Sequence, residues 1–101
     1  MSETVDVVVI GGGPAGLAAA TELRKRGAGR VVLLEREAVA GGIPRHCAHS
    51  PFGMREFGRV LSGAVYTARL TDRALSAGVD MRLRHSVTSI SGTNVDVASP
   101  D

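Results

Sequence analysis

Residues 7–20 read VVVIGGGPAGLAAA, and this stretch decides the fold. Four apolar residues, Val7 to Ile10, come directly before a run of Gly, Pro and Ala. β-Branched side chains favour a strand, and an apolar run without alternation is typical of a strand that is covered on both faces. Residues 4–10 are therefore predicted to form a central strand of a parallel sheet.

The glycines that follow the strand are spaced as in G-x-G-x-x-G, at Gly11, Gly13 and Gly16. Pro14 stands where the first turn of a helix needs no N–H. The first glycine permits a tight strand-to-helix turn, the second lets a phosphate approach the bare backbone, and the third lets the helix lie close to the sheet. The short side chain of Ala15 also leaves room for a ligand.

A helix is predicted from Pro14 to about Arg26, with Gly27 ending it. One face carries small and apolar residues and the other carries polar residues. The apolar face is Gly16, Ala19, Ala20 and Leu23, and the polar face is Thr21, Glu22, Arg24 and Lys25.

A second strand, predicted over Arg30–Leu34, ends at Glu35, 19 positions after Gly16. A carboxylate roughly 20 residues after the glycines binds the adenosine ribose in dinucleotide-binding folds. A flexible glycine loop would explain the glycines alone, but not the strand, helix, strand and acid that surround them. Glu35 would repel a 2′-phosphate, which argues against NADP. Arg36 either covers the adenine and contacts nearby oxygens, or is a solvated surface residue.

The composition of the chain limits its size, its binding partners and its location. The chain has 101 residues, of which 44% are hydrophobic, which suffices for one small domain. Its net charge of +2 and its 3% aromatic content give no indication of nucleic-acid binding. Residues 1–20 have neither the pattern of a secretory signal nor an uninterrupted apolar span. A single cysteine, Cys47, excludes an internal disulfide, so a cytoplasmic location is predicted.

Residues 35–57 form a long irregular segment, and long loops in compact domains are usually functional or disordered. Its apolar residues, Ile43, Phe52, Met54 and Phe57, disfavour disorder. The pair Gly41-Gly42 suggests a backbone that lies against a flat or phosphorylated group. We therefore expect a cofactor loop over residues 36–61.

Together, Gly11 to Gly16, Glu35-Arg36 and Gly41-Gly42 resemble the N-terminal FAD-binding segment of flavoproteins with two dinucleotide-binding domains. Within that group, residues 41–70, GGIPRHCAHSPFGMREFGRVLSGAVYTARL, are similar to oxidoreductase subunits related to the hydrogen cyanide synthase large subunit and to opine and hydroxyproline oxidase subunits. The resemblance covers nearly the whole chain. Residues 41–57 are the part that points to these oxidoreductase subunits within the larger group of flavoproteins.

The resemblance implies FAD as the cofactor and assigns site residues by position. Those expected at the FAD pyrophosphate are Gly11, Gly13, Pro14, Ala15 and Gly16. Those expected at the adenosine are Glu35 and Arg36, with the backbone of Val87 against the adenine. Those expected at the ribityl phosphate or the flavin side are Gly42, Ile43 and Arg45.

Arg45, His46, Cys47 and His49 lie close together in the sequence. Zinc prefers about four ligands in two separated pairs, and the one other histidine, His85, has no neighbouring ligand, so no metal is expected. One alternative is a buried thiol with hydrogen-bonded histidines. The other is a flavin-facing role in which His46 or Arg45 steadies negative charge on the reduced ring. No catalytic residue is assigned.

The remaining elements complete an α/β pattern. A helix is predicted over Ser62–Ala77, with Tyr66, Leu70, Ala74 and Ala77 on one stripe and Gly78 ending it. A third parallel strand follows over Val79–Leu83, then a hairpin over residues 86–101. The fold class is thus a Rossmann-like FAD/NAD(P)-binding domain with a three-stranded parallel sheet, flanking helices and a β-hairpin. Residues 1–101 are expected to be the N-terminal part of this domain, truncated within a longer protein.

Two functions are compatible with this pattern. The first is the FAD-binding part of an oxidoreductase in which flavin accepts a hydride from a small amine, amino acid or hydroxy compound. The second is a nucleotide-binding module for NAD or ADP without catalysis, or a fragment of an NAD-dependent dehydrogenase. The open sheet edge also suggests other oxidoreductase subunits or an oligomer as partners.

Overall fold

The computed structural model describes residues 2–42 and 63–100. Every helix and strand predicted from the sequence is present there, with ends that differ by up to three residues. In chain order they are β1 (Val7–Ile10), α1 (Pro14–Lys25), β2 (Val31–Glu35), α3 (Gly63–Ala77), β3 (Asp80–Leu83), β4 (Ser86–Ser91) and β5 (Asn94–Ala98).

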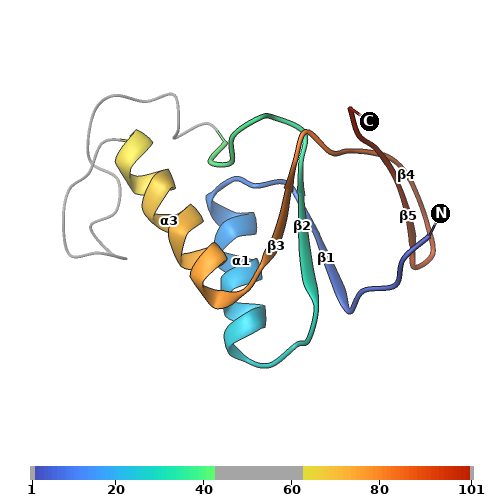
Figure 1. Ribbon diagram of the computed structural model, residues 1–101, viewed down its shortest axis with the longest axis horizontal. Coiled ribbons are helices and arrows are strands. Elements are labelled where there is room, and N and C mark those ends of the chain that lie inside the picture. Colours follow the sequence, from blue (N-terminus) through green and yellow to red (C-terminus); the bar gives the residue numbers. More distant parts are fainter. Residues whose placement is uncertain (1, 43–62, 101) are drawn as a thin grey trace.

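The first three strands form a parallel sheet in the order β1-β2-β3. Val7 pairs with Val31, and Leu33 pairs with Met81. Both crossover connections step in the same direction across the sheet, so right-handed crossovers place both helices on the same face. Figure 1 shows this arrangement, with α1 and α3 together on one side of the sheet. The predicted α/β fold is confirmed.

The prediction that residues 4–10 form a central strand is wrong. Among the described strands β1 lies at an edge of the sheet and β2 lies in its centre. Accordingly, all five residues of β2 are buried, whereas Val7 to Val9 are half-buried and Ile10 is 50% exposed. An unbroken apolar run indicates burial on both faces, but both β1 and β2 have such a run. The pairing order depends on contacts distant in sequence.

The hydrophobic core lies between this sheet and the two helices. The helices contribute Leu17 and Ala20 from α1, and Leu70 and Ala74 from α3. The sheet contributes Val31 and Leu33, alternate residues of β2, and Val79 lies directly before β3. The stripe predicted for α3 is confirmed at Leu70 and Ala74, while Tyr66 packs against the core and is only partly buried.

The two faces predicted for α1 are partly wrong. Thr21, expected on the polar face, is 8% exposed, and its hydroxyl donates to the carbonyl of Leu17 at 2.7 Å. Ala19, expected on the apolar face, is exposed. A threonine can be buried in a helix when its hydroxyl bonds to the carbonyl four residues earlier, because no polar group is then left unsatisfied. The buried side of α1 is therefore centred on Leu17, Ala20 and Thr21.

Arg24 fastens the C-terminal ends of the two helices to one another. Its Nε donates to the carbonyl of Ala77 at 3.1 Å, and its Nη1 donates to the carbonyl of Gly29. The guanidinium lies over Gly78, where a Cβ would come within 2.8 Å of it. Gly78 has a φ of +95°, which fits its predicted role in ending α3.

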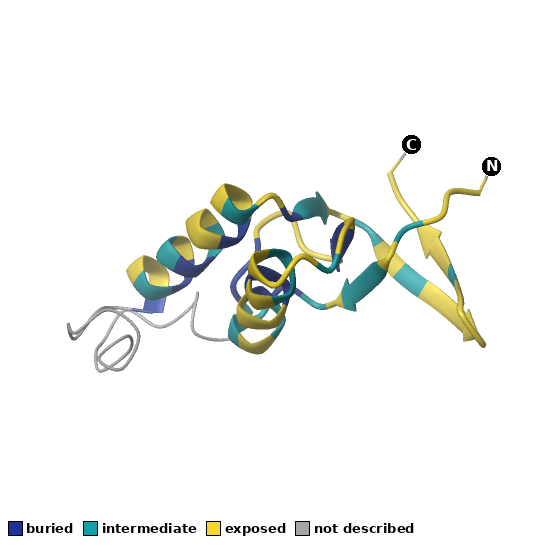
Figure 2. Ribbon diagram, turned by 90° about the horizontal axis from the view of Figure 1, so that it is seen from below, coloured by how far each residue is buried: buried dark blue, intermediate teal, exposed yellow. Residues whose placement is uncertain are grey.

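The hairpin β4–β5 forms a separate antiparallel sheet, as predicted. Its turn contains Gly92 at a φ of +58°. Figure 2 shows that most of the hairpin is exposed, in contrast to β2 and the inner sides of the helices. Ile90 is 62% exposed and Val97 is 40% exposed, so the described residues do not provide a core for this sheet.

An ion-pair network lies where the N-terminal segment meets the start of the strands. Arg82 Nη2 lies 2.7 Å from Glu3 Oε1 and 2.9 Å from Asp80 Oδ2, and Arg30 Nη2 lies 2.9 Å from the same Glu3 oxygen. The hydrogen bond from Arg82 is the main reason why the pKa of the Asp80 carboxyl lies below its ordinary value. The same arginine lowers the pKa of Glu3.

This network predicts a pH-dependent contribution to stability. A carboxyl whose pKa is lower in the folded state stabilises the fold above its unfolded pKa, and the contribution is lost as the pH falls through the folded pKa. Arg82→Gln should lower the free energy of unfolding near pH 6 by about 0.2–1 kcal/mol, as exposed ion pairs do. The gap to the wild type should close as the pH falls below 3.8, the ordinary pKa of Asp80.

Urea denaturation at a series of pH values measures this difference. Lys25→Gln, which removes the same charge from the exposed surface of α1, is the control. A gap between the wild type and Arg82→Gln that is equally large at low and at neutral pH would contradict the prediction.

Candidate dinucleotide-binding site

The turn between β1 and α1 begins at Gly11, whose N–H donates to the carbonyl of Leu34 at 2.8 Å and so extends the parallel pairing by one residue. Gly11 then has a φ of +99°, a conformation that residues with a side chain rarely adopt. The chain turns sharply here, and α1 starts at Pro14. The predicted reason for the first glycine is confirmed.

Gly16 allows α1 to lie close to the end of β1. A Cβ on Gly16 would be 2.0 Å from the carbonyl oxygen of Gly11, so no side chain fits. This confirms the predicted reason for the third glycine. Gly13 is different, since its φ is −74° and a Cβ there would meet no atom of residues 2–42 and 63–100 within 4 Å. Packing within the described part of the chain therefore does not explain the glycine at position 13.

Several backbone amides of the turn have no partner in the part of the chain that the structure describes. The N–H of Leu17 donates to the carbonyl of Gly13, and Pro14 has no N–H. Within the described residues, no partner is found for the N–H groups of Gly13, Ala15 and Gly16. Such groups at the start of a 12-residue helix, together with its dipole, favour an anion.

Glu35 is the last residue of β2 and is only 8% exposed. Its Oε1 accepts a hydrogen bond from the N–H of Gly12 at 2.7 Å, and its Oε2 accepts one from the N–H of Glu37 at 2.8 Å. The carboxylate thus lies directly beside the glycine turn. The sequence analysis predicted a ribose-binding carboxylate at this position.

Gly41 and Gly42 pack against the same turn. The N–H of Gly41 donates to the carbonyl of Gly12 at 2.7 Å. Gly42 has a φ of +63°, and a Cβ there would lie 3.1 Å from Cα of Gly13. Gly42 is therefore needed for a close approach of backbone to backbone. The sequence predicted that the Gly41-Gly42 backbone lies against a flat or phosphorylated group, whereas its neighbour among the described residues is the glycine turn itself.

The two residues between β3 and β4 are hydrogen-bonded to the end of β2 and the segment that follows it. The N–H of Arg84 donates to the carbonyl of Glu37, and the N–H of His85 donates to the carbonyl of Glu35, each at 2.9 Å. Arg84 has a φ of +57°, which is unusual for a residue with a side chain. Val87 lies two residues further along, half-buried in β4. The carboxyl ends of the strands, the usual place for a ligand in a parallel sheet, meet at this edge (Figure 1).

The structure thus brings together most of the residues predicted for the site. They are Gly11, Gly13, Pro14, Ala15, Gly16, Glu35 and Gly42. Arg36 is on the surface, with its side chain 80% exposed and 3.9 Å from that of Glu37. Ile43 and Arg45, like His46, Cys47 and His49, lie outside the described residues, as does most of the predicted cofactor loop 36–61.

Gly12 and Ala40 are the residues that sequence reasoning missed. Gly12 occupies an unspecified position of the motif, yet a Cβ there would come within 3.0 Å of Glu35 Oε1 and 3.2 Å of Cβ of Ala40. Ala40 is 4% exposed. The available signal was the run of three glycines, since the motif itself requires only the outer two.

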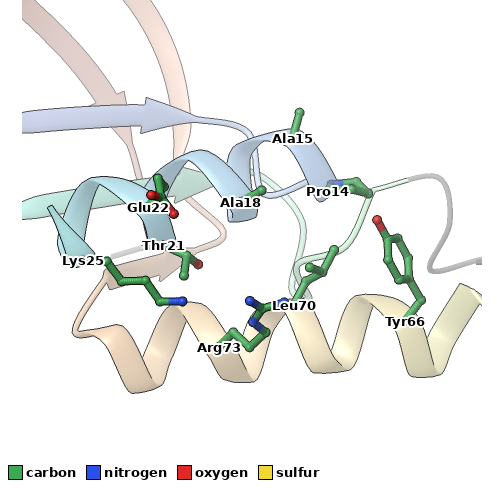
Figure 3. A pocket seen from close by; sticks show the side chains of 9 residues that line it. All are labelled: Pro14, Ala15, Ala18, Thr21, Glu22, Lys25, Tyr66, Leu70 and Arg73. Carbon is green, nitrogen blue, oxygen red and sulfur yellow. The ribbon is translucent and has the colours of Figure 1, made fainter. Parts of the chain in front are cut away.

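A groove of about 380 Å³ runs between α1 and α3 (Figure 3). Pro14 and Tyr66 lie at one end, and Lys25 and Arg73 lie toward the other. The groove follows the side of α1, whereas the amides without partners are at its N-terminal end. It therefore borders the candidate site at Pro14 but is not the diphosphate position.

Within residues 2–42 and 63–100, no three His, Cys, Asp or Glu side chains are grouped as metal ligands. In the same residues, no helix is long and apolar enough to cross a membrane.

Comparison with known proteins identifies related sequences. The sequence model of a family described as FAD dependent oxidoreductase matches residues 6–93. The alpha subunit of sarcosine oxidase from Corynebacterium sp. (strain P-1) is 58% identical over 43 residues, which are 43% of this chain and 4% of that subunit. Aklavinone 12-hydroxylase DnrF from Streptomyces peucetius is 45% identical over 53 residues, which are 52% of this chain and 11% of the hydroxylase.

Solved structures share the fold. The crystal structure of L-proline dehydrogenase from P. horikoshii superimposes with a TM-score of 0.77 and 26% identity. The match covers 95% of this chain and 19% of the dehydrogenase. The chain therefore spans a small part of the length of each of these relatives.

The geometry of the turn predicts that serine is destabilising at position 16 and tolerated at position 13. Gly16→Ser should lower the free energy of unfolding by about 1–3 kcal/mol, as inserted groups do in well-packed sites, because its Cβ would clash with the Gly11 carbonyl. Gly13→Ser, the same chemical change, should leave stability within about 0.5 kcal/mol, since the space is open and serine is a good N-cap. Urea denaturation compares them. Equal losses in both variants would contradict this description of the turn.

Proposed function

Because the chain belongs to the FAD dependent oxidoreductase family, we propose that it is the FAD-binding part of an oxidoreductase that acts on a small molecule. FAD is the cofactor of that family. Residues 1–101 would form the N-terminal part of a Rossmann-like FAD-binding domain, with a cofactor loop over residues 36–61 and a hairpin over residues 86–101.

The observation that carries the proposal is the space above Gly13. A Cβ there meets none of the described residues within 4 Å, and the amides of Gly13, Ala15 and Gly16 have no partner among them. The pyrophosphate of FAD would fill this space and accept from these amides, with Gly11 shaping the turn and Pro14 starting the helix. The residues present therefore fit the cofactor.

The adenosine half of FAD would lie over the ends of β2 and β3. Glu35 would accept hydrogen bonds from the ribose hydroxyls, and Arg36 would lie beside the adenosine. The backbone of Val87 would face the adenine. Gly42, with Ile43 and Arg45 beyond the described residues, would lie toward the ribityl phosphate or the flavin.

When bound, FAD supplies an acceptor for a hydride, and the protein supplies placement and electrostatics. We propose a small amine or amino acid as the hydride donor. The names of two relatives, sarcosine oxidase and L-proline dehydrogenase, support this class. Because one of them is described as a subunit, further oxidoreductase subunits are proposed as partners, and the single cysteine supports a cytoplasmic location.

A second candidate is a flavin-dependent hydroxylase, favoured by the 45% identity with aklavinone 12-hydroxylase. The two candidates differ in what reduces the flavin. In the full-length protein kept free of oxygen, sarcosine or proline should bleach the visible flavin absorption if the amine proposal is correct. Bleaching by NADPH and not by any amine or amino acid would favour the hydroxylase.

Gly13→Val tests the placement of the cofactor. The added side chain would occupy the space proposed for the pyrophosphate, so the purified variant should contain less than about a tenth of the wild-type FAD while remaining folded. Flavin released by denaturation is identified by chromatography and measured by absorbance. Ala19→Val, which places the same side chain at an exposed position of α1, should retain FAD.

Folding of both variants is checked by circular dichroism. Wild-type flavin content in Gly13→Val would mean that the phosphates lie elsewhere. Purification of the wild type with NAD and without flavin would instead support the alternative of a nucleotide-binding module or an NAD-dependent dehydrogenase.

A further inference from the structure

The carboxylate of Glu35 already has two partners within the protein, the N–H groups of Gly12 and Glu37. An ionised carboxylate can accept about four hydrogen bonds. Two acceptor positions therefore remain for ribose hydroxyls, and two are used to fix the backbone on either side of the carboxylate. A residue that served only the ribose would not need these internal bonds.

The contact with Gly12 is the more informative of the two. Gly12 is a buried residue, and its peptide groups are fixed from two directions. Its N–H donates to Glu35 Oε1, and its carbonyl accepts from the N–H of Gly41. A Cβ at Gly12 would come within 3.0 Å of Glu35 Oε1, so only glycine lets the turn lie this close to the carboxylate.

This contact determines which amides face a ligand. The N–H of Gly11 is used by the sheet and that of Gly12 by Glu35, so the amides left for an anion begin at Gly13. Without the carboxylate, the buried N–H of Gly12 would lose a charge-assisted hydrogen bond. The turn would then change its conformation so that this N–H finds another acceptor. The amides of the residues that follow Gly12 would no longer point in the same direction.

We propose that Glu35 is a positioning residue for the diphosphate-binding turn, acting through the amide of Gly12, in addition to its contact with the ribose. This inference rests on the proposed function. It differs from a role confined to the ribose in one measurable respect. Removal of the carboxylate should weaken the binding of a diphosphate whose ribose has no hydroxyls to offer.

The test uses the full-length protein freed of flavin, with ADP and 2′,3′-dideoxy-ADP as probes and titration calorimetry as the measurement. Glu35→Ala should weaken the binding of both ligands, and that of dideoxy-ADP by on the order of tenfold, as expected for the loss of a hydrogen bond to a charged group. If Glu35 acts only on the ribose, the wild type and Glu35→Ala bind dideoxy-ADP equally. That result would overturn the inference.

Glu35→Gln is the matched control, because its amide oxygen can still accept from the N–H of Gly12 while the charge and the second acceptor oxygen are lost. It should recover most of the affinity for dideoxy-ADP but not the full affinity for ADP. Failure of Glu35→Gln to bind dideoxy-ADP better than Glu35→Ala would also overturn the inference. This comparison stays informative even where Glu35→Ala is less stable.

A second measurement needs no ligand. Hydrogen exchange at the amide of Gly12 should be slow in the wild type and in Glu35→Gln, and faster in Glu35→Ala, because this N–H loses its acceptor. Unchanged exchange in Glu35→Ala would contradict the positioning role. A wild type that binds neither FAD nor ADP would instead contradict the proposed function itself, so the two failures are distinguishable.

Discussion

The site depends on one buried contact, between the carboxylate of Glu35 and the N–H of Gly12. A carboxylate that is only 8% exposed must be hydrogen-bonded, because an unpaired buried charge is costly. Among the described residues the backbone supplies both hydrogen bonds to this carboxylate, from the N–H groups of Gly12 and Glu37. The same contact holds the glycine turn at the end of β2, so the requirement to satisfy one charge also sets the position of the turn.

Neighbouring segments are arranged around this contact by backbone hydrogen bonds. Gly41 donates to the carbonyl of Gly12, while Arg84 and His85 donate to the carbonyls of Glu37 and Glu35. These bonds join segments that are far apart in the sequence at the carboxyl edge of the sheet. Both helices cover the same face of that sheet, and α1 starts near this edge (Figure 1). The fold thereby presents backbone groups to a ligand in a small region.

Local sequence patterns were sufficient to predict the helices, the strands, the hairpin and the sharp turn at Gly11. These features depend on neighbours in the chain, such as the spacing of apolar residues or the need for a positive φ. The edge position of β1, the burial of Thr21 and the packing of Gly12 against Ala40 depend on contacts distant in sequence. The positive φ of Arg84 had no signal, because arginine is not a residue that favours this conformation.

The same reasoning explains why relatives that are named for different activities resemble this segment. In the proposed placement of FAD, the turn, Glu35 and the Gly41-Gly42 pair would surround the diphosphate and the ribose, which are common to every FAD molecule. The redox chemistry belongs to the flavin ring, and the substrate meets that ring and not the diphosphate. The sequence of the turn is therefore constrained by its backbone geometry, while specificity for a substrate depends on other residues. An amine oxidase subunit and a hydroxylase can thus share this segment and differ in their reactions.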